Sequence, residues 1–364
     1  MALSPVKQFN TEFFAKKHAV FPFEKSSLGS TGVTFLPLHF ECDTVVKWQN
    51  SSLTETEFLC STLYQRAFSH LSMPHLQIHI EPTVFTHIQR TFRDQNNIDD
   101  KMPMLMEYKQ GNNLSSVFKS GRFAGLPLEE RNQLFHSIGQ VAGYDFLIAN
   151  FDRFVGCNRH AASDTPHKAN GGNIMIEFTV PNALKQEASS LSIRTIHVID
   201  TAPYPDGFFE PSETREVVEE VCLGGSLWDE EEEETFPVES APSDETKPLI
   251  SGSVRRDSRH RDFCEFMQGD AQFIEELAEH IFDGLVQEHK RCSPESQMVH
   301  SAEERKMHKE ALAEGLISAR EHIRSCVTEH LLLELQQIEI TSKAGRIVLD
   351  FMQRNVEFLK SMNT

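Results

Sequence analysis

The chain has 364 residues, with 35 lysines and arginines against 54 aspartates and glutamates and a formal net charge of −19. This balance argues against a nucleic-acid-binding protein, because such binding depends on basic side chains that meet phosphates, and against attachment to an anionic membrane surface. The 7 cysteines are odd in number and include no close pair, which argues against a disulfide framework. The N-terminus lacks the apolar core of a signal peptide, and no window approaches the ~18 apolar residues of a membrane span. We therefore expect a soluble, cytoplasmic, monomeric protein.

The first candidate site is a run of small residues between two β-like segments within residues 20–40. It contains Gly29, Ser30, Thr31 and Gly32. Small side chains let backbone N–H groups approach a phosphate closely. Two glycines are equally common in an ordinary hairpin turn. The run is therefore either part of a nucleotide-binding loop or a plain turn.

A lysine inside an apolar strand is the second candidate. Residues 44–48 (TVVKW) are predicted as a strand because β-branched residues favour strands, and Lys47 is the charged residue in it. Residues 53–69 predict a helix, and in the protein-kinase pattern such a lysine pairs with the nucleotide phosphates and with a helix glutamate. We expect Glu57 as that partner, although a solvated surface pair is the alternative. Glu55, nearer the helix start, is expected merely to offset the helix dipole. One apolar face of this helix is predicted from Phe58, Leu59, Leu63 and Phe68.

Two further strands are predicted before the middle of the chain. Residues 77–85 alternate between apolar and polar, and residues 102–108 (MPMLMEY) form an apolar run that breaks into polar, glycine-containing chain. A two-lobed kinase crosses between its lobes at such a point. The backbone of Met106, Glu107 and Tyr108 is therefore expected to meet the adenine edge, with a plain edge strand as the alternative.

The segment from Asp145 to Pro203 carries the strongest pattern. Residues 127–150 predict a helix with one apolar side, which is expected to deliver Asn150–Arg153 to the surface. Asp152 is then the candidate general base, which would accept or orient the proton of an attacking hydroxyl. Arg153 could hold this loop or contact a phosphate, and the sequence does not choose between the two roles.

Two metal ligands are predicted at one end of a hairpin. Asn173 precedes a strand at residues 174–176, and Asp200 follows a strand at residues 196–199, so pairing of the strands brings both to one end. A carboxylate and an amide oxygen suit Mg²⁺, which is bound by a few carboxylates together with substrate phosphates. Asp152 and Asn173 are 173 − 152 = 21 positions apart, whereas ordinary protein kinases place the asparagine about five positions after the aspartate.

Together, the runs VVKW, NFDRF, GGNIMI and VIDTAP resemble the catalytic domain of the actin-fragmin kinase family. That family consists of atypical protein kinases with the two-lobed kinase fold and with phosphoinositide-kinase-like Asp-Arg and Ile-Asp signatures. The resemblance runs over about residues 23–211. It implies ATP and Mg²⁺ as cofactors and a protein substrate, with actin or an actin complex as the candidate. For the site it implies phosphate binding by Lys47, support of this lysine by Glu57, a base at Asp152, and metal binding by Asn173 and Asp200.

We therefore expect an α+β, two-lobed protein-kinase-like fold. A small β-rich N-lobe would occupy residues 1–108, and a larger, mostly helical C-lobe residues 109–364. Residues 223–258, which include the acidic run DEEEEE, are expected to be a disordered insert. From residue 262 onward the chain is predicted to be mainly helical, with apolar stripes that complete the core of the larger lobe.

The function expected from these patterns is an ATP- and Mg²⁺-dependent protein serine/threonine kinase. Because Asp-Arg and Ile-Asp also occur in phosphoinositide kinases, a lipid or small-molecule kinase is the alternative, although the acidic insert points away from a membrane-facing loop. A pseudokinase scaffold is a third possibility. The retained set of Lys47, Asp152, Asn173 and Asp200 counts against it.

Overall fold

The computed structural model describes residues 24–25, 32–35, 44–49, 51–74, 76–78, 102–107, 109, 111–150, 153–154, 169–179, 191–201, 252–295, 298–299 and 301–363. Over these residues the protein belongs to the mixed α+β class and is mostly helical, with two small antiparallel sheets. None of the described helices is long and apolar enough to cross a membrane.

The larger sheet has five strands in the order β1-β2-β3-β5-β4. Its strands are β1 (Glu24–Lys25), β2 (Gly32–Phe35), β3 (Thr44–Gln49), β5 (Met102–Glu107) and β4 (Leu76–Gln77). The central strand β3 is buried on both faces, as its Val-Val-Lys-Trp run indicates, and Lys47 lies opposite Met104 of β5.

Helix α2 (Ser51–Ala67) packs against this sheet and follows β3 almost directly. Its apolar residues are buried on two sides, not on the single face that the sequence predicts. Phe58 packs against a small cluster that contains Leu76 and Met104 of the sheet, whereas Leu59 and Leu63 belong to the main core. The helix therefore lies between two apolar layers.

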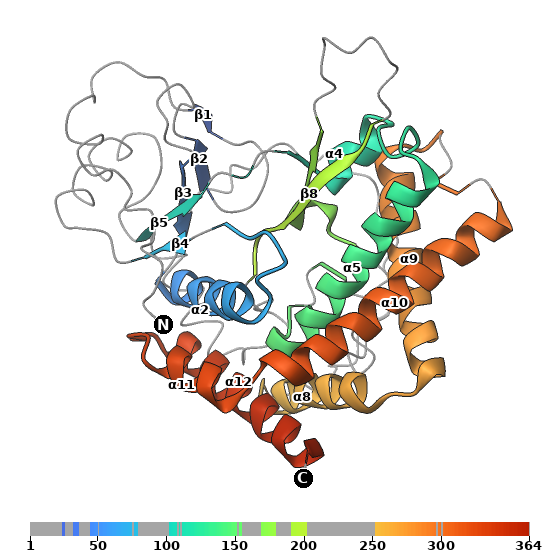
Figure 1. Cartoon of the computed structure of the whole chain (residues 1–364). Coiled ribbons are helices and arrows are strands. Elements are labelled where there is room, and N and C mark those ends of the chain that lie inside the picture. Colours follow the sequence, from blue (N-terminus) through green and yellow to red (C-terminus); the bar gives the residue numbers. More distant parts are fainter. Residues whose placement is uncertain are drawn as a thin grey trace, which may run out of the picture.

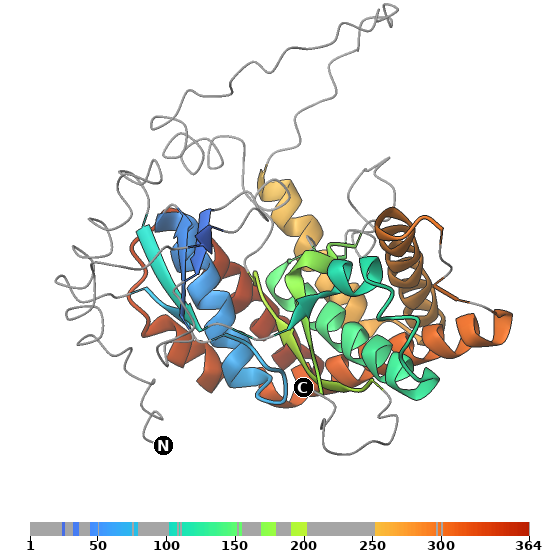
Figure 2. The same cartoon turned by 90° about the horizontal axis from the view of Figure 1, so that it is seen from above.

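The smaller sheet has three strands, β6 (Asn112–Asn113), β7 (Ile174–Phe178) and β8 (Ile193–Val198). Strands β7 and β8 form the predicted hairpin, with Ile174 opposite Val198. The segment after α2 contacts this sheet, because Ser72 pairs with His197 and accepts a hydrogen bond from the Val198 N–H at 3.0 Å. Figure 2 shows the β7–β8 hairpin in yellow-green between the blue α2 and the green α5.

The helices make up most of the remaining described chain (Figure 1). They are α4 (Leu114–Lys119), α5 (Leu128–Ile148), α8 (Gly252–Gln268), α9 (Ala271–Cys292), α10 (Ala302–Cys326), α11 (Glu329–Gln336) and α12 (Lys343–Asn363). Helix α5 is buried all round in its C-terminal half, in agreement with its apolar sequence, and α10 packs along it. The predicted stripe from Leu312 to Leu331 is buried, but it crosses the break between α10 and α11, where Thr328 caps α11.

Small residues allow α5 and α10 to approach closely. A Cβ atom added to Gly315 of α10 would lie 2.0 Å from the carbonyl oxygen of His136, and one added to Gly139 of α5 would lie 2.3 Å from that of Leu312. Contacts this short with backbone atoms cannot be relieved by rotating a side chain. The two glycines therefore fix the separation of α10 from α5, the helix that contacts strand β8 (Ile193–Val198) of the smaller sheet.

Several sequence predictions differ from the structure. The strand expected at residues 77–85 is represented by β4 alone, since Ile78 is outside any strand and residues 79–85 lie outside the described residues. Helix α8 begins at Gly252, so the C-terminal end of the expected insert at 223–258 lies inside a helix. The remainder of that insert lies outside the described residues.

Candidate functional site

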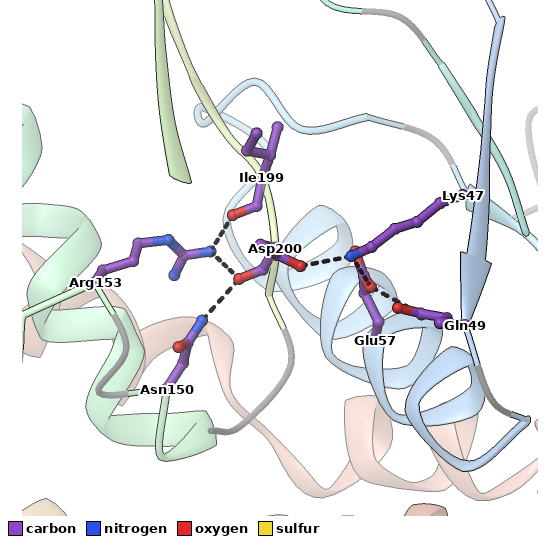
Figure 3. A network of polar contacts seen from close by, with 7 residues as sticks. All are labelled: Lys47, Gln49, Glu57, Asn150, Arg153, Ile199 and Asp200. Carbon is purple, nitrogen blue, oxygen red and sulfur yellow. Dashed lines mark hydrogen bonds and ion pairs between the residues drawn. The ribbon is translucent and has the colours of Figure 1, made fainter. Parts of the chain in front are cut away.

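The candidate site is centred on Lys47, which contacts two carboxylates from separate parts of the chain (Figure 3). Its Nζ lies 2.7 Å from Glu57 Oε2 of α2 and 2.6 Å from Asp200 Oδ1, after the end of β8. The side chains of Lys47 and Glu57 are 7% and 3% exposed, whereas that of Asp200 is 46% exposed. One side of this ion-pair network therefore faces the interior, and the other is open to solvent.

Strand and helix geometry explain how Lys47 meets Glu57. In β3, Lys47 and Gln49 are two residues apart and so point to the same face of the sheet. Both contact Glu57 on the second turn of α2, with Gln49 Nε2 donating to Glu57 Oε2 at 3.0 Å. Gln49 was not identified from the sequence, although its i+2 spacing from Lys47 places it on the same face.

The charges in this network shift one another's pKa values. Burial would lower the pKa of Lys47, but the carboxylates of Glu57 and Asp200 outweigh burial and raise it above its ordinary value. Burial raises the pKa of Glu57, and Asp200 adds to this effect against the opposing charge of Lys47. Lys47 in turn lowers the pKa of Asp200. Lys47 and Asp200 are therefore both charged at neutral pH, and together they offer a fixed cation beside a solvent-accessible anion.

The backbone of Asp200 adopts a left-handed conformation, with φ of 59°. Aspartate is among the few residue types that tolerate this region. The turn directs the carboxylate toward Lys47 and the carbonyl oxygen toward Asn150 and Arg153 (Figure 3). That carbonyl accepts hydrogen bonds of 2.9 Å from both side chains. Asp200 is thus held from the α5 side by its main chain and from β3 by its side chain.

Arg153 holds this loop from within the protein. Its side chain is fully buried, forms an ion pair with Asp145 of α5, and donates to the carbonyl of Ile199 at 2.7 Å. Asp145 also accepts a hydrogen bond of 2.6 Å from the Tyr64 hydroxyl of α2. The expectation that Asn150–Arg153 reach the surface is wrong for both described members of this run, because the polar side chains at these positions are needed inside to bind backbone carbonyls. Of the two roles left open for Arg153, the structure supports anchoring the loop.

Asn173 lies beside Ile199, next to Asp200. The Asn170 side chain caps the short 3-10 turn Gly171–Asn173 by accepting from the Gly172 N–H at 3.1 Å, and the chain then enters β7. The Ile199 N–H donates to the Asn173 carbonyl at 3.2 Å, and the Asn173 residue is 8% exposed. The hairpin therefore brings Asn173 and Asp200 to one end, as the sequence predicts.

No family model matches the chain, and searches of curated proteins and of solved structures gave no match. The geometry of the described residues therefore carries the functional assignment.

Three of the other predicted nucleotide-binding residues belong to β2 and β5, the strands on either side of β3. Gly32 is opposite Trp48, Met106 is opposite Val45, and Glu107 is opposite Thr44. All three are thus on strands that flank β3. The remaining predicted site residues, Gly29, Ser30, Thr31, Tyr108 and Asp152, lie outside the described residues.

Within the described part of the chain, no group of three or more His, Cys, Asp or Glu side chains is placed to hold a metal ion. The predicted donors, Asn173 and Asp200, comprise one carboxylate and one amide. This donor set is too sparse for a structural zinc site, but it is compatible with Mg²⁺, which takes its other ligands from phosphates and water.

Glu55 has a role that its position near the helix start did not suggest. Its carboxylate accepts hydrogen bonds from the hydroxyl of Thr341 at 2.5 Å and from the N–H of Ser342 at 2.8 Å, just before α12. Offsetting the dipole of its own helix is therefore not its main contact, and the prediction made for it is wrong. Its partners are 286 and 287 positions away in the chain, and no local pattern predicts a contact over such a separation.

Proposed function

We propose that the protein is an ATP- and Mg²⁺-dependent phosphotransferase, a protein serine/threonine kinase with a two-lobed protein-kinase-like fold. The observation that carries this proposal is the ion-pair network in which Lys47 joins Glu57 of a helix to Asp200 after a hairpin strand. In protein kinases a strand lysine paired with a helix glutamate contacts the nucleotide phosphates, and an aspartate later in the chain binds Mg²⁺. The same three residue types meet here in corresponding strand, helix and strand-end positions.

The arrangement of the two sheets supports the two-lobed assignment. Strand β5 is the last strand of the larger sheet in chain order and ends at Glu107. The first strand of the smaller sheet begins at Asn112. The N-lobe would comprise the five-stranded sheet with α2, and the C-lobe the smaller sheet with the remaining helices. In this assignment the chain leaves the N-lobe after β5 (Met102–Glu107), and the backbone of Met106, Glu107 and Tyr108 would meet the adenine edge.

The charges of the network suit MgATP. A phosphate would compete with Asp200 for Lys47, whose raised pKa keeps it cationic throughout the physiological pH range. The Asp200 carboxylate is half exposed and would hold Mg²⁺ together with the amide oxygen of Asn173. When bound, Mg²⁺ would neutralise phosphate charge. Glu57 would keep the Lys47 ammonium directed at the phosphates.

The acceptor would be the hydroxyl of a serine or threonine on a protein. Asp152 would accept the hydroxyl proton while the oxygen forms a bond to the γ-phosphorus and the bond to ADP breaks. Because this transition state is loose and rich in charge, most of the acceleration would come from placement and from the charge of Lys47. The resemblance noted in the sequence makes actin or an actin complex the first acceptor to test.

The proposal is tested with the purified full chain, radiolabelled ATP and Mg²⁺. The acceptors are actin, actin complexes, a protein lysate and phosphoinositide vesicles, and labelled lysate proteins are identified by mass spectrometry. We expect label on a protein hydroxyl and a loss of about a thousandfold or more in Asp152→Asn and Asp200→Ala. Asp283→Asn is the matched control, because it removes a partly exposed carboxylate of α9 that pairs with Arg305.

Near-parent turnover in either site variant would refute the assigned role of that aspartate. Label on lipid and not on protein would show that the phosphate acceptor is a lipid. Nucleotide binding without any Mg²⁺-dependent transfer would make the protein a pseudokinase scaffold.

A further inference from the structure

We infer that Glu55 is a positioning residue, through which the C-terminal helix α12 holds α2 in the orientation that pairs Glu57 with Lys47. The inference rests on the proposed function, since it assigns α12 a part in the turnover of that site. Two sets of contacts support it, one between α2 and the start of α12 and one between α12 and the last turn of α5.

Glu55 and Glu57 are two residues apart on α2, and therefore about 200° apart around the helix axis. Glu57 faces β3 and Glu55 faces the start of α12, although both residues are buried, at 2% and 8% exposed. Rotating α2 in either direction would separate one of the two carboxylates from its donors. Figure 1 shows α2 between the five-stranded sheet on one side and α11 and α12 on the other.

The contact between Glu55 and α12 is built from several donors. Glu55 accepts from the Thr341 N–H at 3.2 Å, the Thr341 hydroxyl at 2.5 Å and the Ser342 N–H at 2.8 Å. Burial would raise the pKa of Glu55, but the hydrogen bonds from Ser342 and Thr341 outweigh it and lower the pKa. Ser342 Oγ in turn accepts from the Gly345 N–H at 3.0 Å, which caps the first turn of α12. A Cβ on Gly345 would lie 3.3 Å from Glu55 Oε2, so the helix start and the carboxylate are in close contact.

The same helix is anchored to the other half of the site. Asn355 of α12 is fully buried, and its Nδ2 donates to the carbonyl of Leu147 in the last turn of α5 at 2.9 Å. That turn leads directly to Asn150, which holds the Asp200 carbonyl. From Lys343 to Asn355 the helix rises by about 18 Å. Helix α12 therefore connects the element that carries Glu57 to the element that leads into the loop with Arg153.

The test compares two helix-cap variants in the full chain. Ser342→Ala removes the cap of α12, and Ser301→Ala removes the equivalent cap of α10, where Ser301 Oγ accepts from the Glu304 N–H at 3.0 Å. Both should lower thermal stability by a similar amount. Glu55→Ala and the conservative Glu55→Gln complete the set. The measurements are amide hydrogen exchange of residues 51–67 and the kcat and KM for MgATP turnover.

We expect faster exchange in α2 and a roughly ten- to a hundredfold lower kcat for Glu55→Ala. Ser342→Ala should shift both measurements in the same direction, Ser301→Ala should change neither, and Glu55→Gln should restore part of the activity. The KM should change little, because Glu55 does not contact the nucleotide. Such a split between kcat and KM, together with the comparison of the two caps, separates positioning from a general loss of stability.

Unchanged exchange of α2 in Glu55→Ala would overturn the inference whatever the activity. Faster exchange with an unchanged kcat would overturn the positioning role and leave Glu55 as a structural residue. An equal fall in kcat for Ser301→Ala and Ser342→Ala would also overturn it, since stability alone would then explain the result. If the parent transfers no phosphate to any acceptor, the proposed function fails, and with it the role of Glu55 in turnover. The exchange measurement still reports whether α12 restrains α2.

Discussion

The two contacts of Lys47 should differ in strength, because Glu57 and Asp200 differ in their exposure to solvent. The Lys47–Glu57 pair joins side chains that are 7% and 3% exposed at 2.7 Å, so water screens it little. We expect a coupling free energy of about 2–3 kcal/mol for this pair, the range of a buried charge-assisted hydrogen bond. The Lys47–Asp200 pair is equally short, but the Asp200 side chain is 46% exposed, so its coupling should stay below about 1 kcal/mol.

Two double-mutant cycles that share one variant measure this difference. The first combines Lys47→Met with Glu57→Gln, and the second combines Lys47→Met with Asp200→Asn. Free energies of unfolding are obtained from denaturant titrations, and the coupling is the departure of each double variant from additivity. A coupling in the second cycle equal to or larger than in the first, or additivity within about 0.5 kcal/mol in both, would refute the reasoning.

The pH dependence of Lys47→Met gives an independent check. Burial already raises the pKa of Glu57, and loss of the Lys47 charge should raise it further. A carboxyl whose pKa is higher in the folded than in the unfolded state binds more protons when folded, so stability falls as pH rises between the two values. The deficit of Lys47→Met relative to the parent should therefore be smaller at pH 5 than at pH 8. A deficit that does not change with pH would show that Glu57 stays ionised without its partner.

Two further predictions concern stability away from the site. Gly315→Ala should destabilise by at least about 3 kcal/mol, because its methyl group would lie 2.0 Å from the backbone oxygen of His136, and denaturant titration measures the loss; a near-neutral substitution would contradict the close approach of α5 and α10. His308 is fully buried, and burial lowers its pKa to about 4, so the unfolded chain binds a proton first as the pH falls from about 6.5. This group should remove up to about 3 kcal/mol of stability between pH 6.5 and pH 4. His308→Gln should lose less over the same interval, and equal losses in parent and variant would assign the acid sensitivity elsewhere.

The sequence by itself determined the local elements and the candidate residues on them. Strand β3 follows from a run of β-branched residues, and helix α5 follows from its apolar periodicity. The β7–β8 hairpin was predicted with Asn173 and Asp200 at one end, because a strand pair fixes which residues share an end. The sequence favours Glu57 over Glu55 because Glu55 is nearer the helix start, and the structure pairs Glu57 with Lys47.

The tertiary structure alone decided which distant groups meet and which polar side chains are buried. The burial of Arg153 depends on its contacts with Asp145 and with the carbonyls of Ile199 and Asp200, which the local sequence does not indicate. The hydrogen bonds of Glu55 are made to residues 286 and 287 positions away in the chain. The close approach of α5 and α10 requires glycines in both helices. Periodicity reports which face of an element is apolar, but it carries no information on which other element covers that face. The sequence therefore identified Lys47, Glu57 and Asp200 as candidate site residues. Only the packing of α2, α5 and α12 accounts for how they come together.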